Sequence, residues 1–255
     1  MAARHFHCTA CGKCCHGQLP LTCKDAFANA ARFPLCFVWT PLRQGSKDYL
    51  QVANLGATIK LPGGKKLAVL IVPTVYLPSS FPCPALGSDN LCTIHHNKPS
   101  RCQTMPFYPY REERFQAELL IPRPGWDCDT STAAPIVFQD NKVVCREYFD
   151  LERRDLLEQV PVLRGYADYM LKYSPALVSS LLTAASKARA GHVITSLSSF
   201  LTATKNSEAT HLAQLQLPIL NEYLAKTSGY PQLNDFHKNY LNWSKEMAYL
   251  AQRQM

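Results

Sequence analysis

The chain has 255 residues, of which 47% are hydrophobic and 18% charged, and a formal net charge of +8 at pH 7. This composition can bury a core, so it excludes a disordered chain, and the length allows one large domain or two small ones. The basic excess is spread along the chain, with no run of more than two lysines or arginines, so nucleic acid is not an expected partner.

Membrane insertion and export are both disfavoured by the sequence. The longest apolar run, residues 67–77, contains Pro73 and is too short to cross a bilayer. The N-terminus has no apolar segment of the kind found in secretory signal peptides. We therefore expect a cytoplasmic protein with no membrane partner, in a reducing environment where cysteines stay unpaired.

Residues 1–147 are rich in proline and include all eleven cysteines of the chain. Short β-like stretches alternate there with irregular segments that proline constrains. The predicted strands are residues 49–54, 57–61, 67–72, 115–121 and 136–144. A turn is expected at residues 62–66, and a hairpin turn at Asp140-Asn141.

Residues 148–255 have no cysteine and show apolar side chains at helical spacing. The predicted helices are residues 146–173, 175–190, 192–204, 207–227 and 234–254. Ser174 and Pro175 suit the start of a helix, and Pro218 is expected to kink the helix that contains it.

The predicted fold class is α+β. A small irregular cysteine-rich metal domain with short antiparallel strands is expected over residues 1–147. A mainly α-helical C-terminal region, residues 148–255, is expected to pack on it. The last helix has an apolar stripe, which fits the core or, as an alternative, the binding face of an interaction module. The stripe consists of Tyr240, Trp243, Met247 and Leu250.

Four cysteines lie within eight positions near the N-terminus. They form the motif Cys8-x2-Cys11-x2-Cys14-Cys15, in which two intervening residues let a tight loop direct both thiolates to one metal. The first three have the spacing of ligands in bacterial ferredoxin-type clusters. Because Cys14 and Cys15 are adjacent, their side chains are expected to diverge, which leaves one for a second site or a disulfide. An odd cysteine count excludes a pure disulfide framework, so metal ligation is the first explanation.

A second group is formed by Cys83, Cys92 and Cys102, which are too far apart in sequence for a single metal-binding knuckle. They suit a folded loop that returns three thiols to the first group, and Cys128 beside Trp126 offers an eighth. Three other cysteines fall outside both groups. Because free cysteine is among the most buried residue types, packing is the favoured explanation for these three. They are Cys23, Cys36 and Cys145.

Side chains beside the cysteines leave alternatives open. Arg101 precedes Cys102 and either neutralises thiolates or forms a simple salt bridge. His95 and His96 either donate hydrogen bonds to a thiolate or are exposed. The aromatic residues of the segment 106–110 either pack around the site or form a substrate wall.

The cysteine stretches together resemble a known family. They are CTACGKCC (8–15), CPAL (83–86), CTIHHNKPSRC (92–102) and WDC (126–128). Across residues 6–130 this pattern resembles the CxxCxxCC zinc- or iron-chelating domain family, the YkgJ-like cysteine cluster proteins. The family usually has a tyrosine where this chain has His95 and an arginine where it has Lys98, and neither change removes a thiol.

The resemblance implies a domain that chelates iron or zinc. An iron–sulfur cluster is favoured, [4Fe–4S] by the ferredoxin spacing, with zinc as the alternative cofactor. The implied ligands are Cys8, Cys11, Cys14, Cys15, Cys83, Cys92, Cys102 and Cys128.

The density of thiols without another catalytic motif favours a role in redox chemistry, sensing or metal handling, with an unknown protein or redox partner. Some distant relatives are flagellin lysine N-methylases, reported as iron–sulfur proteins that use S-adenosylmethionine, and such a methylase is the alternative function. Their cysteine run is spaced differently. The chain has none of the common phosphate-loop, nucleophile-elbow or zinc-protease motifs, so whether it is an enzyme stays open.

Overall fold

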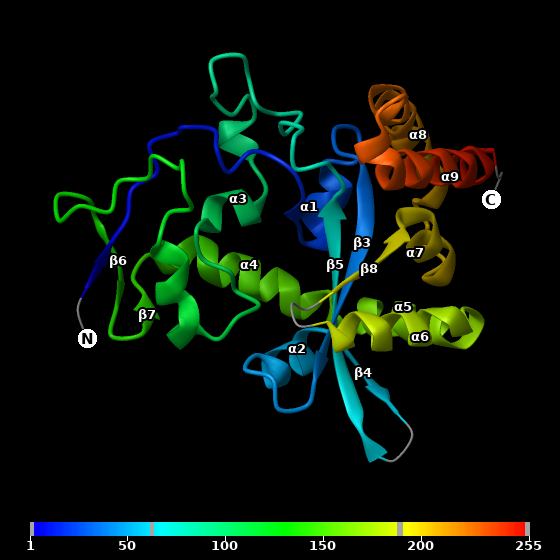
Figure 1. The fold of residues 1–255 in the computed structure, drawn as a ribbon, viewed down its shortest axis with the longest axis horizontal. Coiled ribbons are helices and arrows are strands. Elements are labelled where there is room, and N and C mark those ends of the chain that lie inside the picture. The colour runs from blue at the N-terminus through cyan, green and yellow to red at the C-terminus, as the bar shows by residue number, and fades with distance from the viewer. Residues whose placement is uncertain (1–2, 62–63, 188–190, 253–255) are drawn as a thin grey trace.

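The computed structural model describes residues 3–61, 64–187 and 191–252 and has the predicted α+β fold. Figure 1 shows long strands at the centre of the molecule, with the cysteine-rich segments on one side and the C-terminal helices on the other. Over the described ranges, none of the helices combines the length and the apolar composition needed to cross a membrane.

The main sheet has five antiparallel strands within the described residues. They are β2 (Leu19–Pro20), β3 (Leu35–Arg43), β4 (Ala57–Lys60), β5 (Lys66–Val75) and β8 (Val193–Ser196). Their order is β2-β5-β3-β8, and β4 pairs with the first residues of β5. The long pair β3–β5 runs from Leu35 opposite Val75 to Arg43 opposite Leu67 and forms the centre of the fold.

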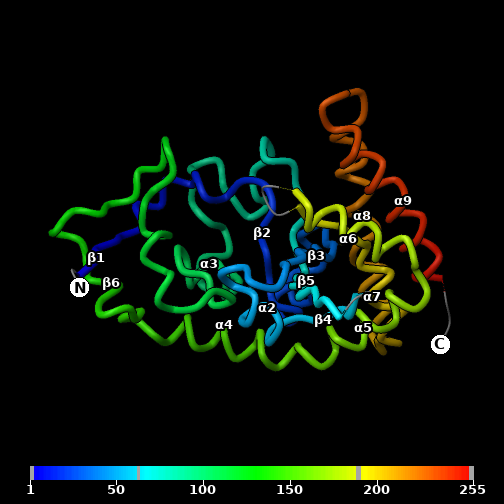
Figure 2. Tube along the Cα trace, turned by 60° about the horizontal axis from the view of Figure 1, so that its bottom comes forward, coloured from blue at the N-terminus to red at the C-terminus, as the bar shows by residue number. Residues whose placement is uncertain are grey.

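A smaller sheet joins the N-terminus to the middle of the chain. Its strands are β1 (Arg4–His5), β6 (Ile136–Gln139) and β7 (Lys142–Val143), in the order β1-β6-β7. The tube in Figure 2 shows β1 beside β6 at one end of the molecule. The predicted hairpin turn is confirmed, because Asp140 and Asn141 have φ values of 50° and 61°, the left-handed conformation that a type I′ turn requires.

Helices make up most of the second half of the chain. The helices are α1 (Cys23–Ala28), α2 (Tyr49–Leu55), α3 (Ser100–Thr104), α4 (Arg146–Glu158), α5 (Val160–Tyr173), α6 (Pro175–Ser186), α7 (Leu197–Ala203), α8 (Ala209–Thr227) and α9 (Asn234–Ala251), and the 3-10 segments are η2 (His95–Asn97), η3 (Glu113–Leu120) and η4 (Pro231–Leu233). Two helices replace the single one predicted over residues 146–173, and they meet at Gln159. α6 begins at Pro175 as predicted, and its predicted end at residue 190 lies outside the described residues.

Three predicted elements are wrong. Residues 49–54 belong to a helix, because Val52 and Leu55 are both buried, which is a helical rather than an alternating spacing. Residues 115–121 fall mostly in η3 rather than in a strand. The helix predicted over residues 192–204 is strand β8 followed by α7, whose start is capped by the Ser196 hydroxyl.

Strand β3 was not predicted at all. Its residues 35–39 are apolar without interruption, so the sequence there lacks the alternation of apolar and polar side chains by which half-exposed strands are recognised. The strand also contains Pro41, which normally argues against a central strand.

The main core is shared by both parts of the chain. Phe37 of β3 stacks on Phe200 of α7, with ring centroids 4.5 Å apart. Trp39 donates from Nε1 to the hydroxyl of Thr195 in β8 at 2.9 Å. The division at residue 147 stays a prediction, while the sheet and the core connect the segments on its two sides.

The apolar stripe of α9 belongs to this core. Tyr240 and Met247 are fully buried, and Trp243 packs against the ring of Tyr76 with centroids 4.9 Å apart. The core explanation for the stripe is therefore confirmed, and the partner-face alternative is wrong.

The buried Gln216 side chain of α8 satisfies backbone groups between α1 and β3. Its Oε1 accepts from the Leu35 amide at 3.0 Å, and its Nε2 donates to the Phe33 carbonyl at 2.7 Å. Gln216→Leu should lower the free energy of unfolding by about 2–4 kcal/mol, because buried backbone groups lose their partner. Urea denaturation followed by circular dichroism measures this. The exposed Gln214→Leu on the same helix is the control, and an equal effect there would contradict the prediction.

Candidate metal centre

The first cysteine group lies on an irregular loop between β1 and β2. The loop turns at Gly12, where the Cys15 amide donates to the Gly12 carbonyl at 3.0 Å. Gly12 has a φ of +71°, and a Cβ on it would lie 3.3 Å from Asn90. Glycine at this position therefore allows both the left-handed turn and the close approach of the loop that carries Cys83 and Cys92.

Backbone hydrogen bonds join the two cysteine loops. The Cys83 amide donates to the Cys15 carbonyl at 2.8 Å, and the Thr93 amide donates to the Ala85 carbonyl at 2.8 Å. The second loop is thereby closed on itself and fixed against the first. α3 follows, and Cys102 lies at the middle of this short helix.

Cys128 is brought to the first loop by a separate set of bonds. His7 and Asp129 exchange two backbone hydrogen bonds of 2.8 and 3.0 Å. The Thr9 hydroxyl donates to the Asp127 carbonyl at 2.9 Å. Residues more than a hundred positions apart therefore lie side by side, with Cys8 and Cys128 each next to a member of the paired backbone.

The eight predicted ligands fall into two neighbouring groups. The inner thiol group contains Cys14, Cys15, Cys83, Cys92 and Cys102, which interact electrostatically with one another. The outer thiol group contains Cys8, Cys11 and Cys128, and the Cys128 thiol also interacts with Cys14. The fold thus gathers the predicted ligands from three separate stretches of sequence.

Cys14 and Cys15 are close, although adjacent cysteines were expected to diverge. Their Sγ atoms are 4.0 Å apart. Hydrogen bonding between them raises the pKa of Cys14 and lowers the pKa of Cys15. Burial, with repulsion from Cys83, raises the pKa of Cys102 to about 12, and burial also raises the pKa of Cys83. A cation among these thiols would relieve the repulsion and favour the thiolate form.

The donor set fits zinc or iron. Thiolates are the preferred ligands of both zinc and iron–sulfur clusters. When two thiolates bind one tetrahedral metal with metal–sulfur distances of about 2.3 Å, their sulfur atoms lie about 3.8 Å apart. This is close to the distance between the Cys14 and Cys15 Sγ atoms. Among the described residues, no three cysteine, histidine, aspartate or glutamate side chains are already drawn together around a single point, so binding requires the thiols to close in.

The other three cysteines are separate from both groups. Cys23 and Cys36 are buried in the main core, where burial raises the pKa of Cys23 to about 12. Packing is therefore confirmed for these two. Cys145 is exposed at the start of α4, so the packing explanation is wrong for it.

Basic side chains surround the inner thiol group. The pKa values of Cys14, Cys83 and Cys102 are raised overall. The positive charges of Lys98, Arg32 and Arg101, respectively, oppose this rise. Positive charge near a thiolate cluster offsets its net negative charge. The sequence indicated Arg101 for this role, whereas no motif marked Arg32.

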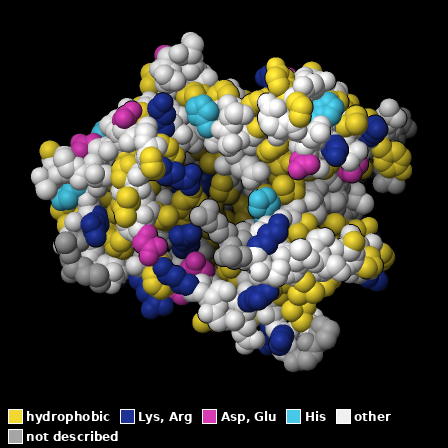
Figure 3. All heavy atoms as spheres, viewed as in Figure 1, with side chains coloured by type: hydrophobic (Ala, Val, Ile, Leu, Met, Phe, Trp, Pro, Cys, Tyr) yellow, Lys and Arg dark blue, Asp and Glu magenta, His cyan; other side chains and the backbone are white. Residues whose placement is uncertain are grey.

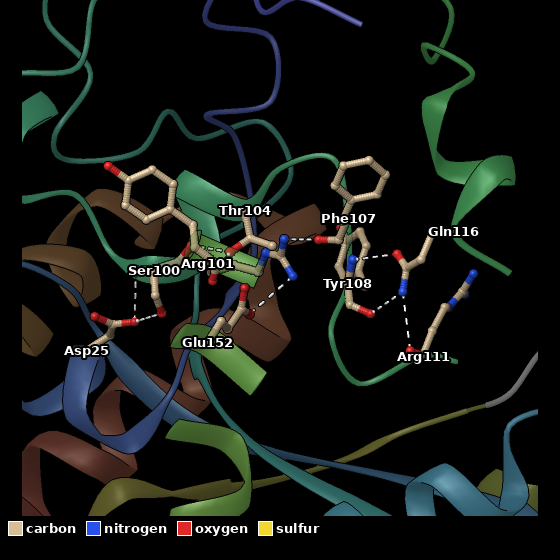
Figure 4. A network of polar contacts seen from close by, with 10 residues as sticks. Asp25, Ser100, Arg101, Thr104, Phe107, Tyr108, Arg111, Gln116 and Glu152 are labelled. Atoms are coloured by element: carbon tan, nitrogen blue, oxygen red, sulfur yellow. Dashed lines mark hydrogen bonds and ion pairs between the residues drawn. The ribbon is translucent and has the colours of Figure 1, made fainter. Parts of the chain in front are cut away.

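Arg101 combines both roles that the sequence allows for it. It is fully buried and forms an ion pair with Glu152 of α4, with Nη1 and Oε1 3.2 Å apart. It also donates to the Phe107 carbonyl, and its guanidinium lies 4.4 Å from the centre of the Tyr108 ring. Figure 4 shows the Arg101 side chain directed toward Glu152 on one side and Phe107 on the other.

Aspartate and glutamate side chains hold α3 in place from two sides. Asp25 of α1 accepts hydrogen bonds from the amide and hydroxyl of Ser100, and Glu152 of α4 pairs with Arg101 (Figure 4). These contacts fix the helix that carries Cys102. Sequence reasoning missed both acidic residues, but Glu152 follows Phe149 by three positions on the buried stripe of α4, and a carboxylate there was a usable signal.

The aromatic residues after Cys102 pack rather than line an open site. Phe107 is buried in a small second core, and Tyr110 is half-buried and packs against a third small cluster. Packing around the site is therefore confirmed for these two residues. His95 and His96 are exposed, which agrees with the second alternative given for them.

Comparison with known proteins finds a similarity in the cysteine-rich part. Residues 7–123 match the family model CxxCxxCC, described as “Putative zinc- or iron-chelating domain”. Residues 7–123, a little less than half of the chain, are therefore similar to this family. The match supports zinc or iron chelation by this part of the chain, and it covers all the predicted ligands except Cys128. No curated protein and no solved structure matches the chain significantly.

Proposed function

We propose that the cysteine-rich part holds an iron–sulfur cluster and serves in redox chemistry, sensing or metal handling in the reducing cytoplasm. The observation that carries this proposal is the gathering of the inner thiol group. Its five cysteines come from two distant loops and from α3, and backbone bonds between the loops bring them together. Cysteines outside the predicted ligand set do not join them.

The inner thiol group would supply the ligands, with the outer thiol group beside it. An iron–sulfur cluster held there would supply one-electron transfer, whereas zinc would supply a structural cross-link. The chain itself contributes positive charge through Lys98, Arg32 and Arg101. Phe107, which follows Cys102, is buried.

The Cys14–Cys15 pair bears on the type of centre. Two thiolates 4.0 Å apart suit one metal that binds both, as in a four-cysteine zinc site or at one iron of a [2Fe–2S] cluster. In a [4Fe–4S] cluster with four cysteines, each iron takes one thiolate. The pair therefore favours [2Fe–2S], while the ferredoxin-like spacing of Cys8, Cys11 and Cys14 favours [4Fe–4S].

The proposal is tested by anaerobic purification with metal analysis, sulfide analysis and a visible spectrum. We expect brown protein with nearly equal iron and acid-labile sulfide, and the iron content per chain then distinguishes the two cluster types. Colourless protein with stoichiometric zinc would contradict the iron–sulfur assignment and retain chelation. Neither metal in stoichiometric amount would contradict the proposal as a whole.

A further inference from the structure

A cleft lies between α6, β8 and α9. It has a volume of about 730 Å³, which is in the usual range for small-molecule sites. It is bounded by the end of α6, the first residues of β8 and the start of α9, with Gln18 and Tyr76 completing its wall. Figure 3 shows one face of the molecule, which is hollowed near its centre.

The cleft is lined by more positive than negative side chains. Lys187 at the end of α6 and Lys238 on α9 line it, together with His192, against a single carboxylate, that of Asp235. In the part of the chain that the structure describes, neither lysine has an ion-pair partner. Unpaired cations that converge on one cleft favour an anionic occupant.

The cleft also contains neutral hydrogen-bond donors. The hydroxyls of Ser179 and Ser180 lie along α6, whereas the Thr183 hydroxyl already donates to the Ser179 carbonyl. Asn239 donates from Nδ2 to the Tyr76 hydroxyl at 2.7 Å, so the hydroxyl hydrogen of Tyr76 is free to donate elsewhere. Burial raises the pKa of Tyr76 to about 12, so this donor keeps its proton at neutral pH.

Part of the cleft wall is apolar. Phe236 is half-buried, and the centroid of its ring lies 4.5 Å from the centroid of the Tyr76 ring. Val193 and Ile194 of β8 line the same cleft. A ring or short hydrocarbon chain would lie against these side chains while an attached anionic group reached the lysines.

We propose that this cleft binds a small organic anion, in which a phosphate or carboxylate is held by Lys187 and Lys238 and an apolar part lies against Phe236. The proposal depends on the cleft alone and not on the identity of the metal.

The test is isothermal titration of the full chain with phenyl phosphate, phenylacetate and inorganic phosphate. We expect saturable binding of one or both organic anions with a dissociation constant of about 1 mM or tighter. The two organic probes distinguish a phosphate from a carboxylate ligand. Inorganic phosphate should bind more weakly than phenyl phosphate, and Phe236→Ala should remove that difference.

The decisive variant is Lys187→Glu/Lys238→Glu, in which affinity should fall at least about tenfold. Lys60→Glu/Lys172→Glu is the matched control, because it makes the same change in net charge at exposed positions outside the cleft. Equal loss in both variants, unchanged affinity in the cleft variant, or no saturable binding of either organic anion would each overturn the proposal. Metal content, measured on every variant, separates this result from a failure of the metal-binding proposal.

Discussion

Cys14→Ser/Cys15→Ser is expected to abolish metal binding, with less than about 0.2 metal per chain left after purification. The two thiols are in contact and belong to the inner thiol group, so the substitution removes two neighbouring ligands at once. The serine hydroxyl is a poor ligand for metals that prefer thiolate. Elemental analysis of the purified variant measures the loss. Because ligands and fold are coupled, the variant should also unfold at lower temperature than the metal-loaded wild type.

Cys145→Ser is the matched control for this experiment. Cys145 is exposed at the start of α4 and lies outside both thiol groups, so its replacement should leave the metal content unchanged. Full metal content in Cys14→Ser/Cys15→Ser would contradict the assignment of these residues as ligands. An equal loss of metal in Cys145→Ser would show that metal binding does not depend on which cysteine is replaced, and would contradict the separation of Cys145 from the two thiol groups.

Arg101→Met is expected to lower the free energy of unfolding by about 3–5 kcal/mol, because it leaves the buried carboxylate of Glu152 without its partner. Arg101 and Glu152 are both almost completely buried, so water cannot replace the lost contact. Urea denaturation of metal-loaded protein measures the effect. The double variant Arg101→Met/Glu152→Leu is the control, since replacing both charges by apolar groups is often neutral.

The loss of unfolding free energy in Arg101→Met should depend on pH in a defined direction. Burial raises the pKa of Glu152 above its ordinary value, and Arg101 opposes this rise. Without the arginine, the folded protein binds the Glu152 proton more tightly than the unfolded chain does. Stability relative to wild type therefore falls as pH rises from the unfolded towards the folded pKa, and the loss is smaller in mildly acid solution. A loss that is equally large at acid and neutral pH would contradict the buried-carboxylate explanation.

The candidate site could be predicted from the sequence to the extent that local spacing determines it. The Cys8–Cys15 run is a local motif, and the family pattern supports Cys83, Cys92 and Cys102 as further ligands. The bonds that join these segments, such as Cys83 to Cys15 and His7 to Asp129, connect distant residues by backbone atoms. Backbone groups carry no residue identity, so no sequence pattern indicates such pairs.

The fold was predicted best where side-chain periodicity is strong. The helices of the C-terminal part were recognised from their apolar spacing, and β5 from its run of branched residues. Strand β3 has no such signal because its residues 35–39 form a continuous apolar run, and β8 is too short to be distinguished from the helix that follows it. Both errors arise from tertiary contacts, since β3 pairs with β5 along its whole length and β8 pairs with β3.

We propose that the inner thiol group, with cysteines from the two loops and from α3, holds one metal centre. X-ray absorption spectroscopy at the edge of the bound metal tests this claim most directly, because it reports ligand type and distance for either iron or zinc. We predict a first shell made only of sulfur at about 2.3 Å. A first shell dominated by nitrogen or oxygen would show that histidines, carboxylates or water bind the metal, and would contradict the assignment of the inner thiol group.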